Sequence, residues 1–504
     1  MIEESAPITM PTIHASAFSS YPTRRASLLF LACVLSYFAF GLSVMTPQHP
    51  WGDDWAQYVL HAQNIVQGRP YAAIGYVFNP DFPNVGPPSY PPGLPLLLVA
   101  PIAWFGVNIF ALKAACFAAL ALSLVVAFEL FRAQAGSTRA AIAVALFAFH
   151  PLTWSLTQWI SSEAPYIALS LLTLWLASRQ TAANRAGWPA LAAGAVIGVS
   201  LYGTVICRSV GIALLPALIL FGWGRRQPST WFAGLVLTFG ALVVLQTRFF
   251  VTPPTYSNEL KIPTPTLFYS NVVNYLRELG GMFPLPAGLS KVSGVLLTVL
   301  ASIGIYRSRV AAGRLSVAAW YLCFYLLALL LVPIEPSSRY LLPVLPIVLF
   351  LTVEGVDSIV SRIQAKRWYA LAIILGVAAY YVQLHRKQIP ENEKSVTCAE
   401  CTAMFGFVRE NTDPDAVIVF AKPRAMAVYS GRHSWRAADG YSGAQLAERM
   451  RSLDARYMVV GAPGSEFAYD YPTSKAVDDA IHGSDATVIF RNSMFEVVQL
   501  GRPQ

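Results

Sequence analysis

The sequence predicts a polytopic α-helical membrane protein with about 11 transmembrane helices and a small C-terminal α/β extracytoplasmic domain. The chain has 504 residues, 55% of them hydrophobic and 12% charged, whereas an average soluble domain is roughly 25% charged. Residues 1–385 hold 22 Lys+Arg and 12 Asp+Glu, a balance of +10, and residues 386–504 hold 14 and 15, a balance of −1. One large soluble enzyme, a disordered chain and a disulfide-stapled scaffold are all disfavoured.

Long apolar runs identify the individual spans. A helix needs about 20 apolar residues to cross a bilayer core. Runs of this kind lie near 27–45, 108–131, 140–158, 164–178, 190–206, 210–224, 231–250, 291–306, 316–333, 341–358 and 369–385. The segment 94–106 is shorter and has a Pro in its middle, so we interpret it as a juxtamembrane or re-entrant helix.

Basic residues test this division and predict the orientation, because Lys and Arg are retained in short cytoplasmic loops. They occur in alternate loops, at Arg24/Arg25, Arg132/Arg139, Arg179/Arg185, Arg225/Arg226, Arg307/Arg309/Arg314 and Arg362/Lys366/Arg367. We therefore expect a cytoplasmic N-terminal segment (1–26), a transmembrane domain (27–385) and an extracytoplasmic domain (386–504). Most of the positive charge then records orientation, and nucleic acid is not an expected partner.

Two long outer segments, 46–107 and 251–290, are rich in Pro, Gly, Tyr and Asn, which favours irregular, shaped loops. Within the first, apolar residues recur at helical spacing over 53–67, as in an amphipathic helix at a membrane surface. The tail alternates short apolar runs with amphipathic stretches. The runs 416–420, 457–460, 487–490 and 495–498 predict strands, and 442–453 and 473–482 predict helices.

Asp53 and Asp54, the acid pair, begin the helix predicted at 53–67. They could simply cap it, because a helix N-terminus favours negative charge. Alternatively, one of them is a catalytic base or metal ligand, since an acid facing a cavity at the membrane surface suits deprotonation of a hydroxyl or amine. The residues alone leave both interpretations open.

Three further charged residues lie on the predicted outer side beside apolar spans. Glu163 follows two serines, and an acid beside a bilayer core is a functional candidate, although it could be a solvated turn residue. Arg208 and Arg339 run against the cytoplasmic bias of basic residues. A guanidinium suits a lipid phosphate; the alternative is snorkelling, or pairing with Glu163 or Glu335.

Cys398 and Cys401 are spaced like a redox or zinc pair, but no strand-helix-strand unit precedes them and no second ligand pair follows. A local disulfide between these two cysteines is the interpretation that stays open. The sequence has no phosphate-binding glycine loop and no serine-hydrolase nucleophile motif, so ATP-driven transport and serine hydrolysis lack support.

The motifs together resemble the GT-C superfamily of polytopic membrane glycosyltransferases, especially the lipid-A aminoarabinose transferases and the protein O-mannosyltransferases. The resemblance rests on these motifs, in the family's order: Asp53-Asp54 with Tyr58, Ala62 and Gly68-x-x-Tyr71; Tyr90-Pro-Pro-Gly-Leu; Ser162-Glu163-x-Pro165; and Arg339-Tyr-Leu-Leu-Pro-x-Leu-Pro346. The tail run Phe420-Ala-Lys422-Pro423-Arg424-Ala, followed by Ser430-Gly431-Arg432, resembles the outer domains of many bacterial members.

The resemblance implies an enzyme that moves a sugar from a polyprenyl-phosphate donor to a lipid, glycan or protein acceptor outside a bacterial cytoplasmic membrane. Asp53 takes the place of the catalytic acid and Glu163 that of the second acid. Arg339, with Arg208 more loosely, takes phosphate-contacting positions. Asp54, Tyr58 and Tyr90 would contact substrate or a metal, and a divalent metal ion could supply part of the cationic role.

Two other classes of function remain open. Several spans with intramembrane charges also suit a secondary transporter or a flippase for lipid-linked sugars. Against these, the charged candidates gather on one side of the membrane and no inverted repeat is visible. The third candidate is a non-catalytic assembly factor whose outer tail binds a partner.

Overall fold

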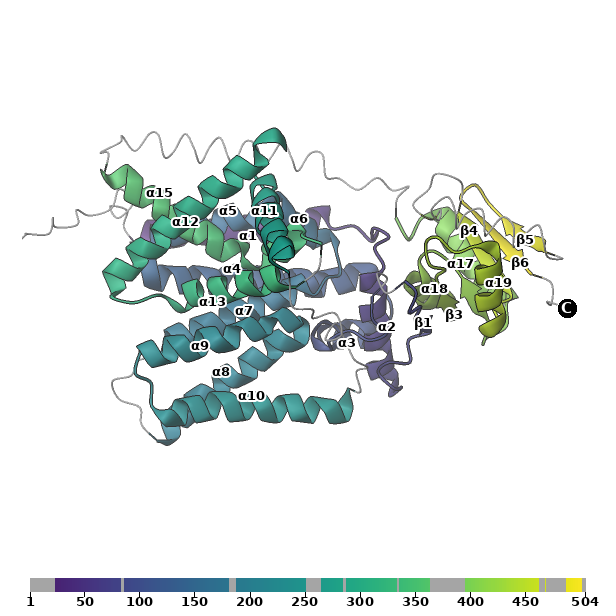
Figure 1. Cartoon of the computed structure of the whole chain (residues 1–504), viewed down its shortest axis with the longest axis horizontal. Helices are drawn as coiled ribbons and strands as arrows, with labels where there is room; N and C mark the ends of the chain where they lie inside the picture. The colour runs from purple at the N-terminus through teal and green to yellow at the C-terminus, as the bar shows by residue number, and fades with distance from the viewer. Residues whose placement is uncertain are drawn as a thin grey trace, which may run out of the picture.

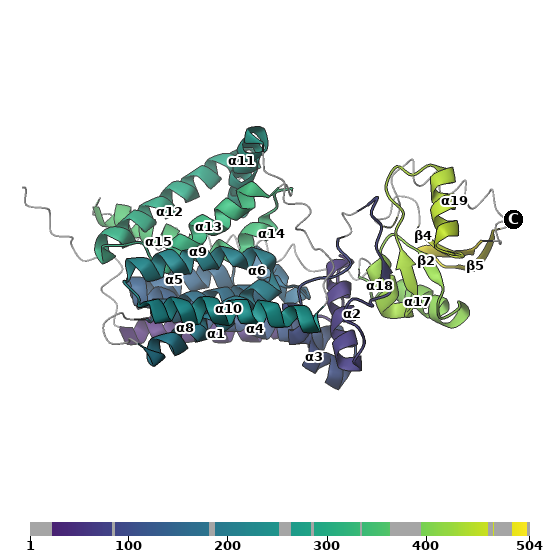
Figure 2. The ribbon, with the colours of Figure 1, turned by 60° about the horizontal axis from the view of Figure 1, so that its bottom comes forward.

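The computed structural model describes residues 23–82, 86–180, 187–250, 264–283, 287–332, 335–362, 395–461, 467 and 486–500. Its helices form an elongated bundle, and a sheet with short helices lies beyond one end of it (Figures 1 and 2). The short helices α2 and α3 lie between these two parts. Several helices of the bundle are long and apolar enough to cross a membrane, as expected of a polytopic helical membrane protein.

Most helices of the bundle coincide with the apolar runs. They are α1 (Thr23–Val44), α4 (Ile109–Ala135), α5 (Ser137–Ala148), α6 (Pro151–Ser155), α7 (Glu163–Ser178), α8 (Trp188–Cys207), α9 (Leu214–Gly224), α10 (Ser229–Phe249), α12 (Ser290–Ala312), α13 (Val317–Leu331), α14 (Ser338–Leu341) and α15 (Leu345–Arg362). Short polar residues start several of them: Asn108 accepts a hydrogen bond from the Ala111 amide, and Ser316 does so from Ala319.

Among the described residues, five helices are long and apolar enough to cross a membrane: α4, α8, α10, α12 and the continuous stretch Ser338–Ser361. A sixth is added if α5 and the segment Pro151–Gln158, bent by 56° at the break, count as one span. Pro151 explains the break, because it lacks the amide hydrogen that a continuous helix needs. Shorter apolar helices occupy four other expected spans, and 369–385 lies outside the described residues, so eleven spans remain a prediction.

At the end of the bundle away from the sheet, two basic residues expected in cytoplasmic loops meet the same acid. Asp357 of α15 is fully buried and pairs with Arg307 of α12 at 2.5 Å and with Arg139 of α5 at 3.3 Å. Arg139 also contacts Glu354 at 3.0 Å. The shared partner means that these two loops lie on the same side of the bundle, as the charge pattern predicts.

The segment 251–290 is not wholly irregular, contrary to the prediction. It contains α11 (Pro265–Gly281), which Thr264 caps by accepting a hydrogen bond from the Leu267 amide at 3.2 Å. Pro265 occupies the first turn of the helix, where its missing amide hydrogen costs nothing. Proline, one of the residue types that we took as a sign of irregular structure, therefore begins a helix here.

In the segment 46–107, α2 (Asp54–Gln67) follows the amphipathic pattern closely, and α3 (Gly93–Phe105) is the short helix expected there. α2 contacts both α3 and a helix of the C-terminal part, α18 (Pro423–Ser430). Its polar residues Gln57, His61 and Asn64 are buried together with its apolar ones. Protein therefore covers much of this helix, which we expected to lie on the membrane surface.

The C-terminal part carries α17 (Ala399–Asn411), α18 and α19 (Gly443–Ser452) around a six-stranded sheet. The strands are β1 (Tyr76–Val77), β2 (Val417–Val419), β3 (His433–Trp435), β4 (Tyr457–Gly461), β5 (Thr487–Arg491) and β6 (Phe495–Gln499), in the order β1-β3-β2-β4-β6-β5. The first four in this order pair in parallel, while β6 is antiparallel to β4 and β5. The helix predicted at 473–482 lies outside the described residues. Cys398 and Cys401 form a disulfide beside α17.

The sheet includes chain from the first outer segment. β1 adds to β3 with Tyr76 opposite Ser434, and Trp51 lies in a cluster of aromatic rings from the C-terminal part. A single antiparallel bridge also joins Pro50 to Ser395. These contacts fix the C-terminal part against the segment that carries the acid pair.

Candidate functional site

All seven site residues expected from the sequence lie in one network at the end of the bundle near the sheet. They come from α2 and the residue before it, the chain before α3, the start of α7, the residue after α8, and α14. The members are Asp53, Asp54, Tyr58, Tyr90, Glu163, Arg208 and Arg339. Because the structure describes only their placement, their roles in a reaction remain predictions.

Arg339 connects two of the acids. Its Nη1 lies 3.1 Å from Asp54 Oδ2, and its Nε donates to Glu163 Oε1. These bonds use two of its five N–H groups, and its side chain is 37% exposed. A guanidinium in this position can still bind an oxyanion from the open side of the site.

Glu163 is fully buried and is shared between two cations. It pairs with Arg208 as well as with Arg339. Pairing with Glu163 was one of the alternatives that the sequence left open for both arginines, and the structure contains both pairs. Arg208 also donates to Ser162 Oγ at 3.5 Å, and Tyr58 donates to the same oxygen at 3.2 Å. Ser162 and Glu163 thereby connect α2 to the arginines.

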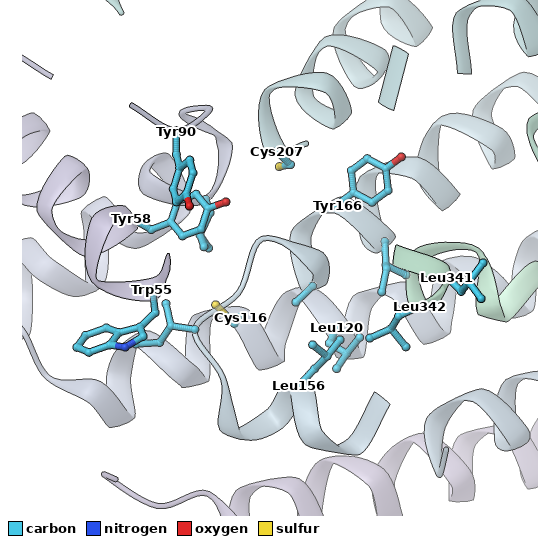
Figure 3. Packing of buried hydrophobic residues seen from close by; sticks show 14 of the residues in the cluster. Trp55, Tyr58, Tyr90, Cys116, Leu120, Leu156, Tyr166, Cys207, Leu341 and Leu342 are labelled. Carbon is cyan, nitrogen blue, oxygen red and sulfur yellow. The ribbon is translucent and has the colours of Figure 1, made fainter. Parts of the chain in front are cut away.

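Tyr58 and Tyr90 line the network with aromatic surface. Their ring centroids are 4.9 Å apart, and Figure 3 shows the two side chains next to each other. The Tyr90 hydroxyl donates to Asp54 Oδ1 at 2.8 Å. His61 accepts a hydrogen bond from the Tyr90 amide at 3.1 Å, so the tyrosine is held at both its backbone and its hydroxyl.

The two members of the acid pair have different surroundings. The Asp54 side chain is 43% exposed and contacts Arg339, Arg424 and Tyr90. Burial raises the pKa of its carboxyl, but the nearby guanidinium groups of Arg339 and Arg424 outweigh burial, and the pKa is lowered overall. Asp54 is therefore a stable anion and a weak proton acceptor.

Asp53 is more enclosed, with a side chain only 14% exposed. The simpler interpretation expects Asp53 to cap its own helix, α2, but its side chain makes no capping hydrogen bond there. Instead, its Oδ1 accepts a hydrogen bond from the Ala425 amide of α18 at 3.2 Å. Burial raises its pKa, although Arg424, the Ala425 amide and Lys422 oppose this. Its Oδ2 has no hydrogen-bond partner among the described residues.

Two residues that the sequence did not identify as part of the site also contribute. Glu278 of α11 accepts a hydrogen bond from the Ser338 amide at 2.8 Å and so fixes the start of the helix that carries Arg339. Arg424 of α18 contacts both members of the acid pair. In the sequence, Arg424 stands out only as a member of the tail motif. Nothing in that motif indicates that Arg424 contacts residues about 370 positions earlier in the chain.

The side-chain chemistry does not fit a divalent metal. Among the described residues, no group of three or more His, Cys, Asp or Glu could hold one. Arg424 contacts both carboxylates of the acid pair, and Glu163 holds two arginines. Each acid that a metal would need already has a cationic partner, so we derive no step through a metal ion.

Part of the sequence and the overall fold resemble those of known membrane glycosyltransferases. Residues 89–247 match the family model described as dolichyl-phosphate-mannose-protein mannosyltransferase. No curated protein matches the sequence. Together with the solved structures described next, the family match shows that the chain has the fold of the GT-C membrane glycosyltransferases, and the resemblance predicted from the motifs is confirmed.

Solved structures of this fold align over most of the chain. ArnT from Cupriavidus metallidurans bound to undecaprenyl phosphate is 13% identical, with a TM-score of 0.56 over 95% of this chain and 99% of that one. The Archaeoglobus fulgidus oligosaccharyltransferase in complex with Zn and sulfate is 12% identical, with a TM-score of 0.55 over 86% and 68%. The arabinofuranosyltransferase AftD from Mycobacteria is 16% identical, with a TM-score of 0.50 over 97% and 40%.

Proposed function

We propose that this protein is an integral-membrane glycosyltransferase that transfers a sugar from a polyprenyl-phosphate donor to an acceptor on the outer face of a bacterial cytoplasmic membrane, with inversion. The observation that carries the proposal is the position of Arg339 between Asp54 and Glu163, at one end of a GT-C bundle. In support, one protein of this fold is described with undecaprenyl phosphate bound. The proposed orientation rests on the alternation of basic loops in the sequence.

In this proposal Asp53 is the base. A polyprenyl-phosphate sugar is already activated, so the enzyme has to position the acceptor, remove its proton and stabilise the leaving group. A carboxylate whose pKa is raised by burial accepts a proton more readily than an exposed one. Burial raises the pKa of Asp53, and its Oδ2 accepts no hydrogen bond from the described residues. Asp54, with its lowered pKa, instead holds Arg339.

In the proposed transfer, one bond forms at the anomeric carbon and one breaks. The acceptor oxygen attacks the anomeric carbon as its proton passes to Asp53. The bond between this carbon and the phosphate oxygen breaks on the opposite face, and its electron pair remains on the polyprenyl phosphate. Arg339 stabilises the developing phosphate charge, and Arg208 supports it from the buried side.

The test uses purified full-length protein with radiolabelled polyprenyl-phosphate sugars and a membrane extract as the source of acceptor. We expect release of unlabelled polyprenyl phosphate and label in the acceptor fraction. Asp53→Asn keeps an oxygen for the Ala425 amide but cannot take a proton, so transfer should be lost while the protein is still expressed and folded. The exposed acid Asp413 provides the matched control, Asp413→Asn.

The same experiment separates the other candidate functions. Movement of intact donor lipid across reconstituted vesicles, without cleavage, would identify a flippase. Neither cleavage nor movement, with tight binding of another envelope protein, would identify an assembly factor. Mass spectrometry of envelope glycans from a deletion strain would then identify the sugar and the acceptor.

A further inference from the structure

Arg424 is a charged residue of the C-terminal part that lies inside the proposed transfer site. Its side chain is completely buried. Nη1 lies 3.3 Å from Asp54 Oδ1 and 3.1 Å from the Tyr90 hydroxyl oxygen, and Nε lies 3.8 Å from Asp53 Oδ2. One guanidinium from α18 therefore contacts both members of the acid pair on α2.

The surroundings of Arg424 hold its guanidinium in place from several directions. Its central carbon lies 4.9 Å from the ring centroid of Tyr76 and 5.1 Å from that of Tyr90, within the range of cation–π attraction. Gly86 leaves the space that the guanidinium fills, because a Cβ there would lie 2.5 Å from Nη2. The φ of Gly86 is +110°, which also favours glycine.

Burial of Asp53 makes a nearby cation necessary. A carboxylate removed from water is costly unless an opposite charge accompanies it. In the network around the acid pair and Glu163, three carboxylates face three guanidinium groups, those of Arg208, Arg339 and Arg424. Among the described residues, Arg339 contacts Asp54 but not Asp53. Arg424 is therefore the guanidinium that balances the charge of Asp53.

We propose that Arg424 is the resident counter-cation of the acid pair, a positioning residue that keeps Asp53 and Asp54 as carboxylates in place of a divalent metal ion. This inference rests on the proposed function, since it assigns how the base is held. α18 supplies the Ala425 amide to Asp53 as well. The transfer site is therefore complete only when the C-terminal part is docked on α2.

The experiment compares Arg424→Gln and Arg424→Lys in the full-length protein. A matched control is Arg449→Gln, because Arg449 pairs with Asp81 across the same interface at 2.7 Å and is exposed. We expect Arg424→Gln to lower kcat by roughly 100-fold with little change in KM for the donor, since Arg339 and Arg208 are untouched. Arg424→Lys should recover part of kcat, and Arg449→Gln should retain at least half of it.

A pH profile distinguishes positioning of the base from a general structural role. The groups that face Asp53 are Arg424, Lys422 and the Ala425 amide at the start of α18, Asp54 of α2, and Tyr76 of β1. Without the guanidinium, the acid limb of kcat/KM should move to higher pH by about 1 pH unit or more, and Arg424→Lys should move it back. A purely structural residue would lower kcat without moving this limb.

Three results would overturn the inference. The first is an Arg424→Gln protein with the kcat and pH profile of the Arg449→Gln control. The second, which remains decisive if Arg424→Gln does not fold, is an Arg424→Lys protein that has the wild-type thermal midpoint but is inactive. The third is loss of wild-type transfer on adding EDTA with recovery on adding Mn²⁺.

A measurement without turnover separates this inference from the proposed function. Mn²⁺ should leave the thermal midpoint of the wild-type protein unchanged, because the Arg424 guanidinium already occupies the position next to the acid pair. Mn²⁺ should raise the thermal midpoint of Arg424→Gln, in which this position lacks a positive charge. A wild-type shift as large as the variant's would contradict the inference. If wild-type protein transfers no sugar from any polyprenyl-phosphate donor, the proposed function fails, and the Mn²⁺ comparison alone decides the role of Arg424.

Discussion

The ring centroid of Trp51 lies 4.5 Å from that of Phe467, inside the core of the C-terminal part. Trp51 is 2% exposed and also contacts Phe405, Phe420 and Phe495. It precedes the acid pair by only two residues, so the packing of this one ring couples the core of one part of the protein to the proposed active site of the other.

We predict that Trp51→Ala destabilises the protein by about 3–5 kcal/mol, the usual cost of removing a large buried aromatic side chain. Transfer activity should fall with it, because the acid pair would no longer be held against α18. Trp51→Phe should keep most of both. Thermal unfolding in detergent, with protease accessibility of the C-terminal part, measures the effect.

The control for this prediction is Trp188→Ala, because Trp188 is 77% exposed at the start of α8. It should leave the thermal midpoint and protease pattern unchanged. If Trp51→Ala behaves like this control, the aromatic cluster does not hold the two parts together.

Arg339 should not tolerate lysine. Its guanidinium reaches Asp54 and Glu163 through two different nitrogens, whereas an ammonium is a single point charge that cannot reproduce this fork. We expect Arg339→Lys to lower kcat/KM by roughly 100-fold and to weaken binding of polyprenyl phosphate itself. Steady-state transfer and binding of the lipid phosphate in detergent measure the two effects.

Arg309→Gln serves as the comparison, since Arg309 is exposed near the end of α12. It removes the same charge from the chain without approaching the network. Equal lipid-phosphate affinity in Arg339→Lys and Arg309→Gln would remove Arg339 from the role of phosphate ligand.

Much of the bundle is predictable because helices in lipid must satisfy their own backbone hydrogen bonds and present apolar side chains. The spans α4, α8, α10 and α12 therefore follow from hydropathy alone. The acids and arginines of the site are predictable for a related reason: in a chain with 12% charged residues, a charge beside an apolar span is exceptional and stands out.

The contacts between distant segments are not predictable in this way. β1 is two residues long, and its pairing with β3 joins Tyr76 to Ser434; neither strand carries a local signal for the other. The same holds for Arg424, whose partners on α2 are 370 and 371 positions earlier in the chain. Such contacts depend on how whole elements dock, and one sequence does not record this docking.

Glu163 and Arg208 should show strong energetic coupling. Glu163→Gln leaves two arginines without their shared buried partner, and breaking a buried ion pair from one side costs about 3–5 kcal/mol. Replacing Arg208 by Gln as well removes part of the uncompensated charge. The double variant should therefore lose less stability than the sum of the two single variants, by about 1 kcal/mol or more.

Unfolding of the four proteins in the same detergent measures this coupling. The unrelated pair Asp357→Asn and Arg208→Gln, at opposite ends of the bundle, gives the additive baseline. Additivity within about 0.5 kcal/mol for Glu163 and Arg208 would mean that their contact contributes no mutual stabilisation.

His61 should make the protein less stable as the pH falls from about 6.5 to about 4. Its Nδ1 faces the Tyr71 carbonyl at 2.8 Å and its Nε2 faces the Tyr90 amide at 3.1 Å; a carbonyl only accepts and an amide only donates, so the ring is neutral with its proton on Nδ1. Burial lowers its pKa from 6.5 to about 4. Between these values the unfolded chain binds the proton and the folded chain does not. A contribution to the free energy of unfolding of roughly 3 kcal/mol, fully present above pH 6.5, is therefore lost progressively toward pH 4.

Thermal midpoints measured from pH 7.5 to pH 4.5 should fall less steeply for His61→Gln than for the wild type, while the exposed His433→Gln should keep the wild-type slope. Identical slopes for wild type and His61→Gln would show that His61 does not carry this proton linkage.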